Sequence, residues 1–407
     1  MRYVLLLSLA AGALFAADKP EKGFVALFNG KDLTGWTKAK ENEDSWSVKD
    51  GAIVANGKRA HLYYTGPFKG KAPAFKNFEL KVDVMTKPVS NGGIYFHTAY
   101  QETNWPDKGF EVQVNNSHGD WKKTGGLYNV QDNKEPFKDD EWFTEHIIVQ
   151  GKHVQVFVNG KKVSDWTQPA DWQVTAQNLP EHARNAIHTD AGAQAAGFPR
   201  ALVAGVTTYA YLTHPLATAW GLDWVARGGG EVRFRRPVFD GDTVSCRVEP
   251  DGNAVIVSAV TSEPGQPRAV FRAVRVADDA PALRPGEPLP VLSLALDGEF
   301  GSDYGSRAGD PFDLYRREQV VHPAVWPALA NQLVHAHVAR GSWIHMRSIV
   351  RHHAVAPVGA HAEVHANVVR RFQSHGERAV LDVHVLVNDA VVASLEHEAI
   401  VALPPTS

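Results

Sequence analysis

Lysine is missing from the second part of the chain. All 20 lysines lie at or before Lys162, and residues 163–407 contain none. Arginine has the reverse distribution, with Arg2 and Arg59 in the first part and 20 arginines from Arg184 to Arg378. A single domain with one history rarely divides its cations in this way. The composition therefore predicts two separately shaped pieces that join near residue 170.

Cysteine and strong net charge are also scarce. The one cysteine, Cys246, excludes an internal disulfide and a cysteine-rich metal site. A net charge of -3 leaves neither piece basic enough to have nucleic acid as its main partner. The 14 histidines of the second piece lack the spacing of a metal motif. We therefore predict no metal site and no tightly bound cofactor.

Long apolar runs are missing beyond the N-terminus. Residues 1–17 combine Arg2, an apolar stretch and a small-residue end, a pattern typical of a secretory signal peptide. The stretch is too short for a mature transmembrane helix. A buried N-terminal helix is the alternative. The signal peptide predicts a secreted or periplasmic protein.

Residues 18–169 consist of alternating runs separated by turn signals such as Asn159-Gly160. Apolar and polar residues alternate with period two, as in half-buried antiparallel strands, and no helix is expected. The strand-like runs are 78–84, 93–97, 110–114, 146–149 and 154–158. The pattern predicts an all-β sandwich.

An ordered series of motifs adds a family to this prediction. It comprises residues 24–36, 46–51, 77–80, 91–97, 109–114, 125–128, 141–142 and 158–161. The series resembles the 3-keto-disaccharide hydrolase family, which implies a jelly-roll, concanavalin-like sandwich. Members usually close with a strand of the type aromatic-Arg-Asn-Ile, and no such strand is found here. Its absence would expose an edge of the sandwich.

The resemblance implies chemistry on an oxidised sugar. A 3-keto group acidifies the C2 hydrogen, so a base can remove it, expel the C1 substituent and let water add afterwards. Glu111 is the expected base, with His97 and Gln113 as donors to the enolate oxygen. Glu111 and Gln113 are two residues apart and share one strand face. A polar face that is merely exposed, or that only binds sugar, is the alternative.

Four further residues are expected to bind the sugar. Asn91 and Tyr128 match family positions near the expected base. Trp105 and Trp121 lie in polar, loop-like segments, where aromatic side chains suit a binding surface.

The sequence of the second piece predicts one long helix followed by several strands, and this pattern occurs twice. Residues 203–220 predict a long helix, and strands continue up to residue 276. After a proline-rich linker at 281–290, the helix-like segment 323–340 again precedes several strands. The offset of roughly 115 to 120 residues suits one small domain. We predict an α+β double hotdog with repeats at 170–280 and 291–407.

Motifs at 185–190, 195–198, 202–206 and 232–242 resemble the MaoC-like dehydratase family. Its members hydrate or dehydrate acyl thioesters, usually of coenzyme A, and carry Asp-x-Asn-Pro-x-His with a catalytic aspartate and histidine. Asn185 and His188 match that motif, whereas Ala183 stands at the aspartate and Ala186 at the proline. The resemblance thus implies a degenerate catalytic motif.

A coenzyme A thioester is the substrate that the resemblance implies. His188 can move a proton, and the backbone at Gly205, where the long helix begins, can bind the thioester oxygen. Asn185 and Asp190 are the other expected binding positions. A thioesterase, an acyl-binding hotdog without this chemistry and a structural His188 are the alternatives.

The two pieces imply different cellular addresses, because a signal peptide exports the chain behind it and coenzyme A thioesters are cytoplasmic. A natural fusion with a changed hotdog is one interpretation. An artefactual or engineered chimera is the second, and a sugar-binding sandwich on a hotdog scaffold is the third. Hotdog units commonly pair through their sheets, so homo-oligomers are expected unless the two repeats pair with each other.

Overall fold

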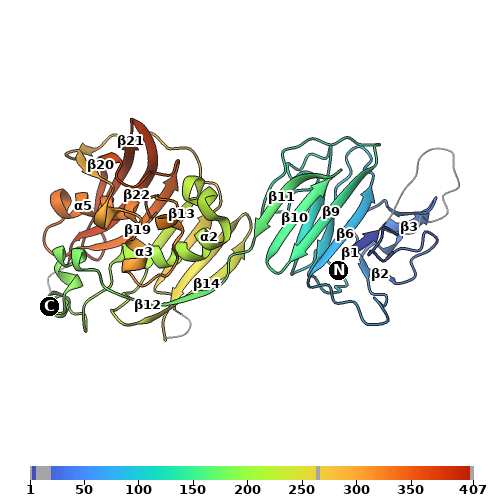
Figure 1. Cartoon of the computed structure of the whole chain (residues 1–407), viewed down its shortest axis with the longest axis horizontal. Coiled ribbons are helices and arrows are strands. Elements are labelled where there is room, and N and C mark those ends of the chain that lie inside the picture. The colour runs from blue at the N-terminus through green and yellow to red at the C-terminus, as the bar shows by residue number, and fades with distance from the viewer. Residues whose placement is uncertain (1, 6–19, 263–265, 404–407) are drawn as a thin grey trace. The chain divides into compact units, whose positions relative to one another are not determined.

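The computed structural model describes residues 2–5, 20–262 and 266–403, which form two compact units divided between Gln168 and Pro169 (Figure 1). Of the predicted signal peptide, only Arg2–Leu5 is described, as strand β1. The rest of that segment lies outside the described residues.

The first unit is a β-sandwich, as predicted. Its main sheet has the order β1-β6-β9-β10-β11. These strands are β1 (Arg2–Leu5), β6 (Phe78–Val84), β9 (Phe143–Gln150), β10 (His153–Val158) and β11 (Lys161–Thr167). The hairpin of β7 (Gly92–Phe96) and β8 (Phe110–Val114) shares a core with this sheet, where Val112, Leu127, Ile147 and Val156 are almost fully buried. Alternate burial along β9 and β10 agrees with the period-two pattern of the sequence.

Smaller elements complete this unit. They are the pairs β2 (Trp36–Lys38) with β5 (Leu62–Tyr64) and β3 (Trp46–Lys49) with β4 (Ala52–Ala55), and a 3₁₀ turn η1 at Glu43–Ser45. The predicted turn at Asn159-Gly160 joins β10 to β11, and both residues have positive φ.

The two edges of the main sheet show whether another strand replaces the closing strand that the sequence lacks. β1 runs parallel to β6 and covers one edge. Beyond β11, the next strand, β12 (Trp172–Thr175), pairs with β14 of the second unit instead of extending this sheet. Removal of the predicted signal peptide would therefore leave β6 unpaired on one side, and an unpaired strand invites pairing with another chain.

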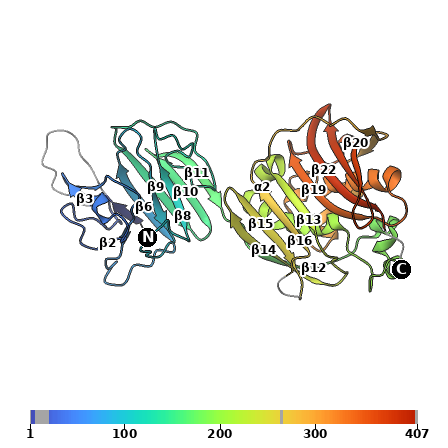
Figure 2. The same cartoon turned by 180° about the vertical axis from the view of Figure 1, so that it is seen from behind.

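The second unit is a double hotdog, as predicted. Figure 2 shows its strands as one continuous sheet, in the order β12-β14-β15-β16-β13-β19-β22-β21-β20-β17, with β18 also on β20. The first repeat contributes β12, β13 (Gly229–Phe234), β14 (Thr243–Asp251), β15 (Ala254–Val260) and β16 (Ala269–Val274). The second contributes β17 (Glu287–Pro288), β18 (Leu292–Ala295), β19 (Ile344–His352), β20 (His361–Gln373), β21 (Glu377–Val387) and β22 (Ala390–Ala402).

The strand order is symmetric about the antiparallel pair β13–β19. From this seam outwards the first repeat runs β13, β16, β15, β14, β12, and the second runs β19, β22, β21, β20, β18. The internal repeat therefore holds at the level of topology, and the two repeats pair within one chain. The predicted linker at 281–290 is not wholly irregular, because β17 within it pairs with β20.

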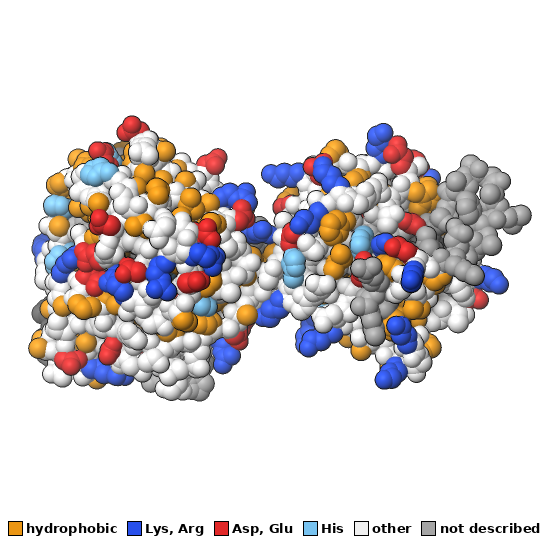
Figure 3. Space-filling view, viewed as in Figure 1, with side chains coloured by type: hydrophobic (Ala, Val, Ile, Leu, Met, Phe, Trp, Pro, Cys, Tyr) orange, Lys and Arg blue, Asp and Glu red, His pale blue; other side chains and the backbone are white. Residues whose placement is uncertain are grey.

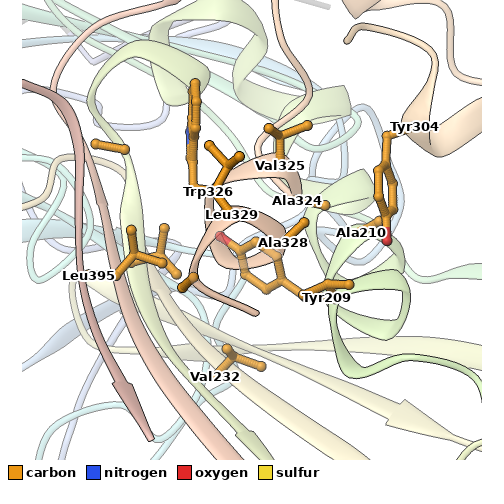
Figure 4. Packing of buried hydrophobic residues seen from close by; sticks show 14 of the residues in the cluster. Tyr209, Ala210, Val232, Tyr304, Ala324, Val325, Trp326, Ala328, Leu329 and Leu395 are labelled. Atoms are coloured by element: carbon orange, nitrogen blue, oxygen red, sulfur yellow. The ribbon is translucent and has the colours of Figure 1, made fainter. Parts of the chain in front are cut away.

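Helices fill the concave side of the sheet. α2 (Gly205–Arg227) carries a break at Gly221, where φ is +58°. α5 (Val325–Leu333) continues into a π-helical turn, η5, at Val334–Val338. Figure 4 shows Tyr209 of α2 beside Ala328 and Leu329 of α5 in this core. The single cysteine, Cys246, is fully buried there, as expected for a small apolar residue.

Short elements precede each long helix. Before α2 lie η2 (Pro180–Arg184), η3 (Ala186–His188) and α1 (Asp190–Ala195), and before α5 lie η4 (Gly298–Phe300), α3 (Tyr304–Arg307) and α4 (Leu314–Arg317). No helix in the described part of the chain is both long and apolar enough to cross a bilayer. On the face shown in Figure 3, acidic and basic side chains intermingle on both units, which suits partners other than nucleic acid.

Ion pairs connect the strands of the second sheet. Arg284 contacts Asp382 and Glu396 at 2.5 and 2.6 Å, and Arg347 contacts Glu396 and Glu231. Although burial works in the opposite direction, hydrogen bonds and charge from these arginines lower the pKa of all three carboxyl groups. Their contribution to stability is present above the ordinary carboxyl pKa and is lost as the pH falls through the lowered values.

Acid should consequently loosen this part of the sheet. We expect amide hydrogen exchange in β21 and β22 to accelerate between pH 5 and pH 3, after correction for the intrinsic rate. Asp382→Asn should reduce that pH dependence. Arg284 is half exposed, so each of its pairs should contribute less than about 1 kcal/mol. Exchange in β21 and β22 with the same pH dependence in wild type and Asp382→Asn would contradict this assignment.

Candidate functional site

Glu111 is the second residue of β8 and lies opposite Tyr95 of β7. The Tyr95 hydroxyl donates a hydrogen bond of 2.7 Å to Glu111 Oε2. Burial raises the pKa of Glu111 to about 7, and the nearby charge of Asp120 adds to the effect, while the Tyr95 bond opposes it. A Cβ at Gly93 would collide with the Glu111 carboxylate, so glycine at that position makes room for the side chain. Glu111 is thus a carboxylate with the basicity of an ordinary histidine.

Gln113 and Asn91 lie together on the same strand pair. Gln113 Nε2 donates to Asn91 Oδ1 at 2.7 Å, and Gln113 Oε1 is buried without a hydrogen-bond partner in the described structure. Asn91 Nδ2 lies 3.3 Å from His118 Nδ1. The alternation of β8 places Gln113 on the Glu111 face, as the spacing predicts. Because the amide nitrogen of Gln113 is already engaged, it is a weaker candidate for the enolate donor than the sequence suggests.

The structure does not bring His97 to Glu111. His97 lies just beyond the end of β7 with φ of +57°, which breaks the strand alternation. Its Nε2 lies 2.9 Å from the Lys76 carbonyl oxygen, and its ring packs edge-on against Phe78. The His97 ring, which the sequence predicts as an enolate donor, instead contacts the Lys76 backbone and Phe78. Tyr95, two residues earlier, is the side chain that contacts the carboxylate.

Tyr128 borders the glutamate, and Lys122 links Tyr128 to Trp121. The Tyr128 amide donates to the Glu111 carbonyl oxygen at 2.8 Å. Lys122 Nζ lies 3.6 Å from the ring centroid of Trp121 and 5.9 Å from that of Tyr128. Trp121 is 63% exposed, although large aromatic side chains are usually well buried. Tyr128 therefore lies against Glu111, whereas Lys122, over the exposed Trp121 ring, is paired with Asp132 at 2.8 Å.

A second group lies on the other side of Tyr95. The His61 ring meets the Tyr95 ring edge-on at 5.7 Å, and its Nδ1 is buried without a hydrogen-bond partner in the described structure. Trp105 is 60% exposed and stacks with the Arg59 guanidinium at 3.9 Å. Sequence reasoning missed both residues: Tyr95 lies in the run 93–97, which is typical of an ordinary strand, and His61 lies in no predicted motif.

Replacement of Tyr95 should shift the titration of Glu111. Tyr95→Phe removes the hydrogen bond that lowers the Glu111 pKa, so we expect that pKa to rise above about 7. Carboxyl carbon NMR measures it directly, and Tyr63→Phe is the control because Tyr63 does not contact the carboxylate. A Glu111 pKa near 4.5 in the wild-type protein would refute the burial argument.

In the second unit, His188 is held in one tautomer. It ends η3, and its Nδ1 lies 2.7 Å from the Leu202 carbonyl oxygen, which can only accept. Nδ1 therefore carries the proton, and the neutral ring presents Nε2 as a base. Burial lowers the pKa of His188, which keeps the ring neutral at pH 7, although the Leu202 carbonyl opposes that shift.

Two other predicted residues of this site, Asn185 and Asp190, form hydrogen bonds within the protein. Asn185 Nδ2 donates to the Trp343 carbonyl oxygen at 2.8 Å, which ties η3 to the start of β19. Asp190 accepts a hydrogen bond of 2.8 Å from the Ala201 amide and begins α1. These bonds give both residues a structural function, and nothing in the geometry assigns Asp190 to a substrate.

Gly205 begins α2, as the sequence predicts. The position of the missing aspartate, Ala183, is exposed on η2, whereas the neighbouring His182 points inwards. His182 Nε2 lies 3.0 Å from the Tyr304 hydroxyl and 3.2 Å from Thr207 Oγ1 of the first turn of α2. Burial lowers the pKa of His182 to about 3, with a further contribution from His188. His182 and His188 thus stand near the helix N-terminus as neutral rings.

A surface cavity of the sandwich is separate from the predicted site. It is lined by residues 77–79 and 148–151, and it contains none of the predicted site residues. Within the described ranges, no group of three His, Cys, Asp or Glu side chains is arranged to hold a metal ion.

The chain is a two-domain protein that joins a concanavalin-like sandwich to a double hotdog. Its N-terminal domain is of the 3-keto-disaccharide hydrolase family, and its C-terminal unit carries a MaoC-like domain. The model of the 3-keto-alpha-glucoside-1,2-lyase-like domain matches residues 23–193, and that of the MaoC like domain matches residues 178–264. The first match runs past Gln168 into the second unit, where the MaoC-like match begins.

Several solved structures are similar to parts of the chain. One from Chloroflexus aurantiacus, described as a MaoC domain dehydratase, has 13% identity and a TM-score of 0.43, covering 59% of this chain and 97% of its own. One from Parabacteroides distasonis, described as a glycosyl hydrolase, has 25% identity and a TM-score of 0.31, covering 36% and 72%. A double-hotdog protein of Mycobacterium tuberculosis has 13% identity and a TM-score of 0.40, covering 57% and 96%. No curated protein matches the chain.

Proposed function

We propose that the N-terminal domain cleaves 3-keto-glycosides by elimination and hydration, outside the cytoplasm, with Glu111 as the base. The observation that carries this proposal is the half-buried Glu111 carboxylate beside Tyr95 and Tyr128. A base with a pKa of about 7 is more effective at neutral pH than an ordinary carboxylate, because about half of it is still ionised and it binds the abstracted proton more strongly.

Each neighbour of Glu111 has a place in this reaction. Tyr95 holds Oε2, so Oε1 is the atom that takes the C2 proton. The C2 electron pair forms the enolate with the 3-keto group, the C1–O bond breaks, and water later adds at C1. The Tyr128 hydroxyl, which lies near Glu111, is the proposed donor to the enolate oxygen. Trp121 offers the sugar ring an apolar platform.

Glu111→Gln should abolish cleavage of a nitrophenyl 3-keto-glucoside, because the amide keeps the size of the side chain but cannot accept the proton. A loss of about 10²- to 10⁴-fold in kcat is expected for a general base. The release of nitrophenol measures it, and Glu102→Gln, an exposed glutamate paired with Lys40, is the control. Full activity of Glu111→Gln would refute the assignment of the base. A wild-type protein that binds the sugar without cleaving it would support the alternative of a sugar-binding module.

For the second unit we propose hydration of an acyl thioester at His188. The fixed tautomer of His188 favours this function over plain structural packing, because it leaves Nε2 available beside the N-terminus of α2. His188 Nε2 takes a proton from water, the hydroxide adds to the β-carbon of the enoyl thioester, and the α-carbon receives a proton in return. Amides at the start of α2 would hold the thioester oxygen during this step.

His188→Gln should abolish hydration of crotonyl-CoA by the whole chain, since the amide has no basic nitrogen in place of Nε2. Loss of the absorbance of the conjugated thioester measures the reaction. His361→Gln, on β20 and bonded to Ser293, is the control. Hydration that persists in His188→Gln would exclude this base. Hydrolysis to free coenzyme A without hydration would favour the thioesterase alternative.

A further inference from the structure

Three buried polar side chains of the second hotdog repeat, His345, Ser348 and His397, form a hydrogen-bonded trio. The trio lies near the start of α2, a helix of the first repeat. His345 Nε2 is 2.8 Å from Ser348 Oγ, and Ser348 Oγ is 2.9 Å from His397 Nδ1. The three side chains are 6%, 0% and 0% exposed. The ring nitrogens at the two ends of this hydrogen-bonded trio, His345 Nδ1 and His397 Nε2, lack a hydrogen-bond partner in the described structure. An unpaired polar group in a core costs about 1 to 3 kcal/mol, so this arrangement calls for an explanation.

A β-bulge creates the trio. The pairing of β19 with β22 shifts register between His345 and Arg347. In a regular strand, residues three apart point to opposite faces, and the extra residue brings His345 and Ser348 to the same buried face. His397 lies directly opposite Ser348 on β22. Bulges commonly re-aim a side chain beside a functional site.

The free nitrogen of His345 points at the N-terminus of α2. A Cβ built on Gly205 would lie 3.4 Å from His345 Nδ1 and 3.5 Å from the ring of Phe234. Phe234 belongs to β13, so Gly205, Phe234 and His345 meet at the seam between the two repeats. Asn185 bonds to Trp343, two residues before His345, and Ile344 packs against Ile187 and Leu202. The segment that bears His188 therefore lies on the same end of the seam.

We propose that His345 Nδ1 donates a hydrogen bond to the thioester oxygen beside Gly205, as a second oxyanion donor contributed by the other repeat. This inference rests on the acyl-thioester function proposed above. Burial and then the proximity of His397 hold the pKa of His345 well below its usual value, although the Arg347 backbone works in the opposite direction, so the ring is neutral. A neutral imidazole near a helix N-terminus can polarise a carbonyl without a net proton transfer.

The proposed role requires one direction of the hydrogen bonds that join His345, Ser348 and His397. When His397 Nδ1–H donates to Ser348 Oγ, the serine hydroxyl donates to His345 Nε2, and the proton of His345 must then reside on Nδ1. The opposite direction of the two bonds would place a lone pair on Nδ1, which would repel an approaching oxygen. Ser348 and His397 are thus positioning residues. Binding of the oxygen satisfies the donor that the free protein leaves unpaired.

Histidine ¹⁵N NMR of the full chain tests the proposal without turnover. Butyryl-CoA is the probe, because a saturated thioester can bind but cannot be hydrated. We expect its addition to shift His345 Nδ1 and to show a directly bonded proton there, with His188 also perturbed. His352 is the matched control, since it is a buried histidine on the same face of β19 that lies against Trp224 instead of Gly205. Perturbation of His188 without His345 would overturn the role of His345 and leave the acyl site standing.

Absence of any perturbation by butyryl-CoA would overturn the acyl site itself, and this inference with it. Kinetics with crotonyl-CoA provide the second measurement. His345→Leu should lower kcat by about 10²- to 10³-fold with little change in KM, the usual effect of losing an oxyanion donor. His345→Asn, whose amide nitrogen can replace Nδ1–H, should retain more activity, and His352→Gln should leave hydration unchanged. Equal losses in His345→Leu and His345→Asn would contradict a donor role.

Discussion

The antiparallel pairing of β13 with β19 is the constraint on which the second unit depends. It joins the two repeats into one sheet, so neither repeat presents that edge to solvent. Gly205 at the start of α2 lies near residues of both strands, Phe234 on β13 and His345 on β19. A site formed there draws on both repeats. The second repeat lies beyond the residues that the MaoC-like domain model matches.

Most of this architecture could be predicted from the sequence. Alternation identified the strands, and the recurrence of a helix and then strands identified two hotdog units before any pairing was known. The bulge at His345 could not be predicted, because it depends on the register with β22. Without the bulge, the spacing of three between His345 and Ser348 would place them on opposite faces. The trio is consequently hidden in a sequence where 14 scattered histidines show no metal-binding spacing.

In the sandwich site too, local strand geometry could be predicted from the sequence and contacts that depend on strand register could not. The spacing of Glu111 and Gln113 correctly placed both on one face of β8, because strand geometry fixes that relation locally. The partner of Glu111 depends on the opposite strand, and the register of β7 presents Tyr95 there. His97 was expected nearby, yet its left-handed backbone directs the ring to Lys76 and Phe78. Local periodicity predicts a face of a strand but not a positive φ at its end.

Desolvation works in opposite directions on the two proposed bases, with a common result. It disfavours the charged form, so it raises the pKa of Glu111 and lowers that of His188. Glu111 becomes a competent base only when the pH approaches about 7, whereas His188 is already neutral there. Both proposed reactions can therefore run at neutral to mildly alkaline pH in one chain. Acidity therefore does not separate the two proposed reactions.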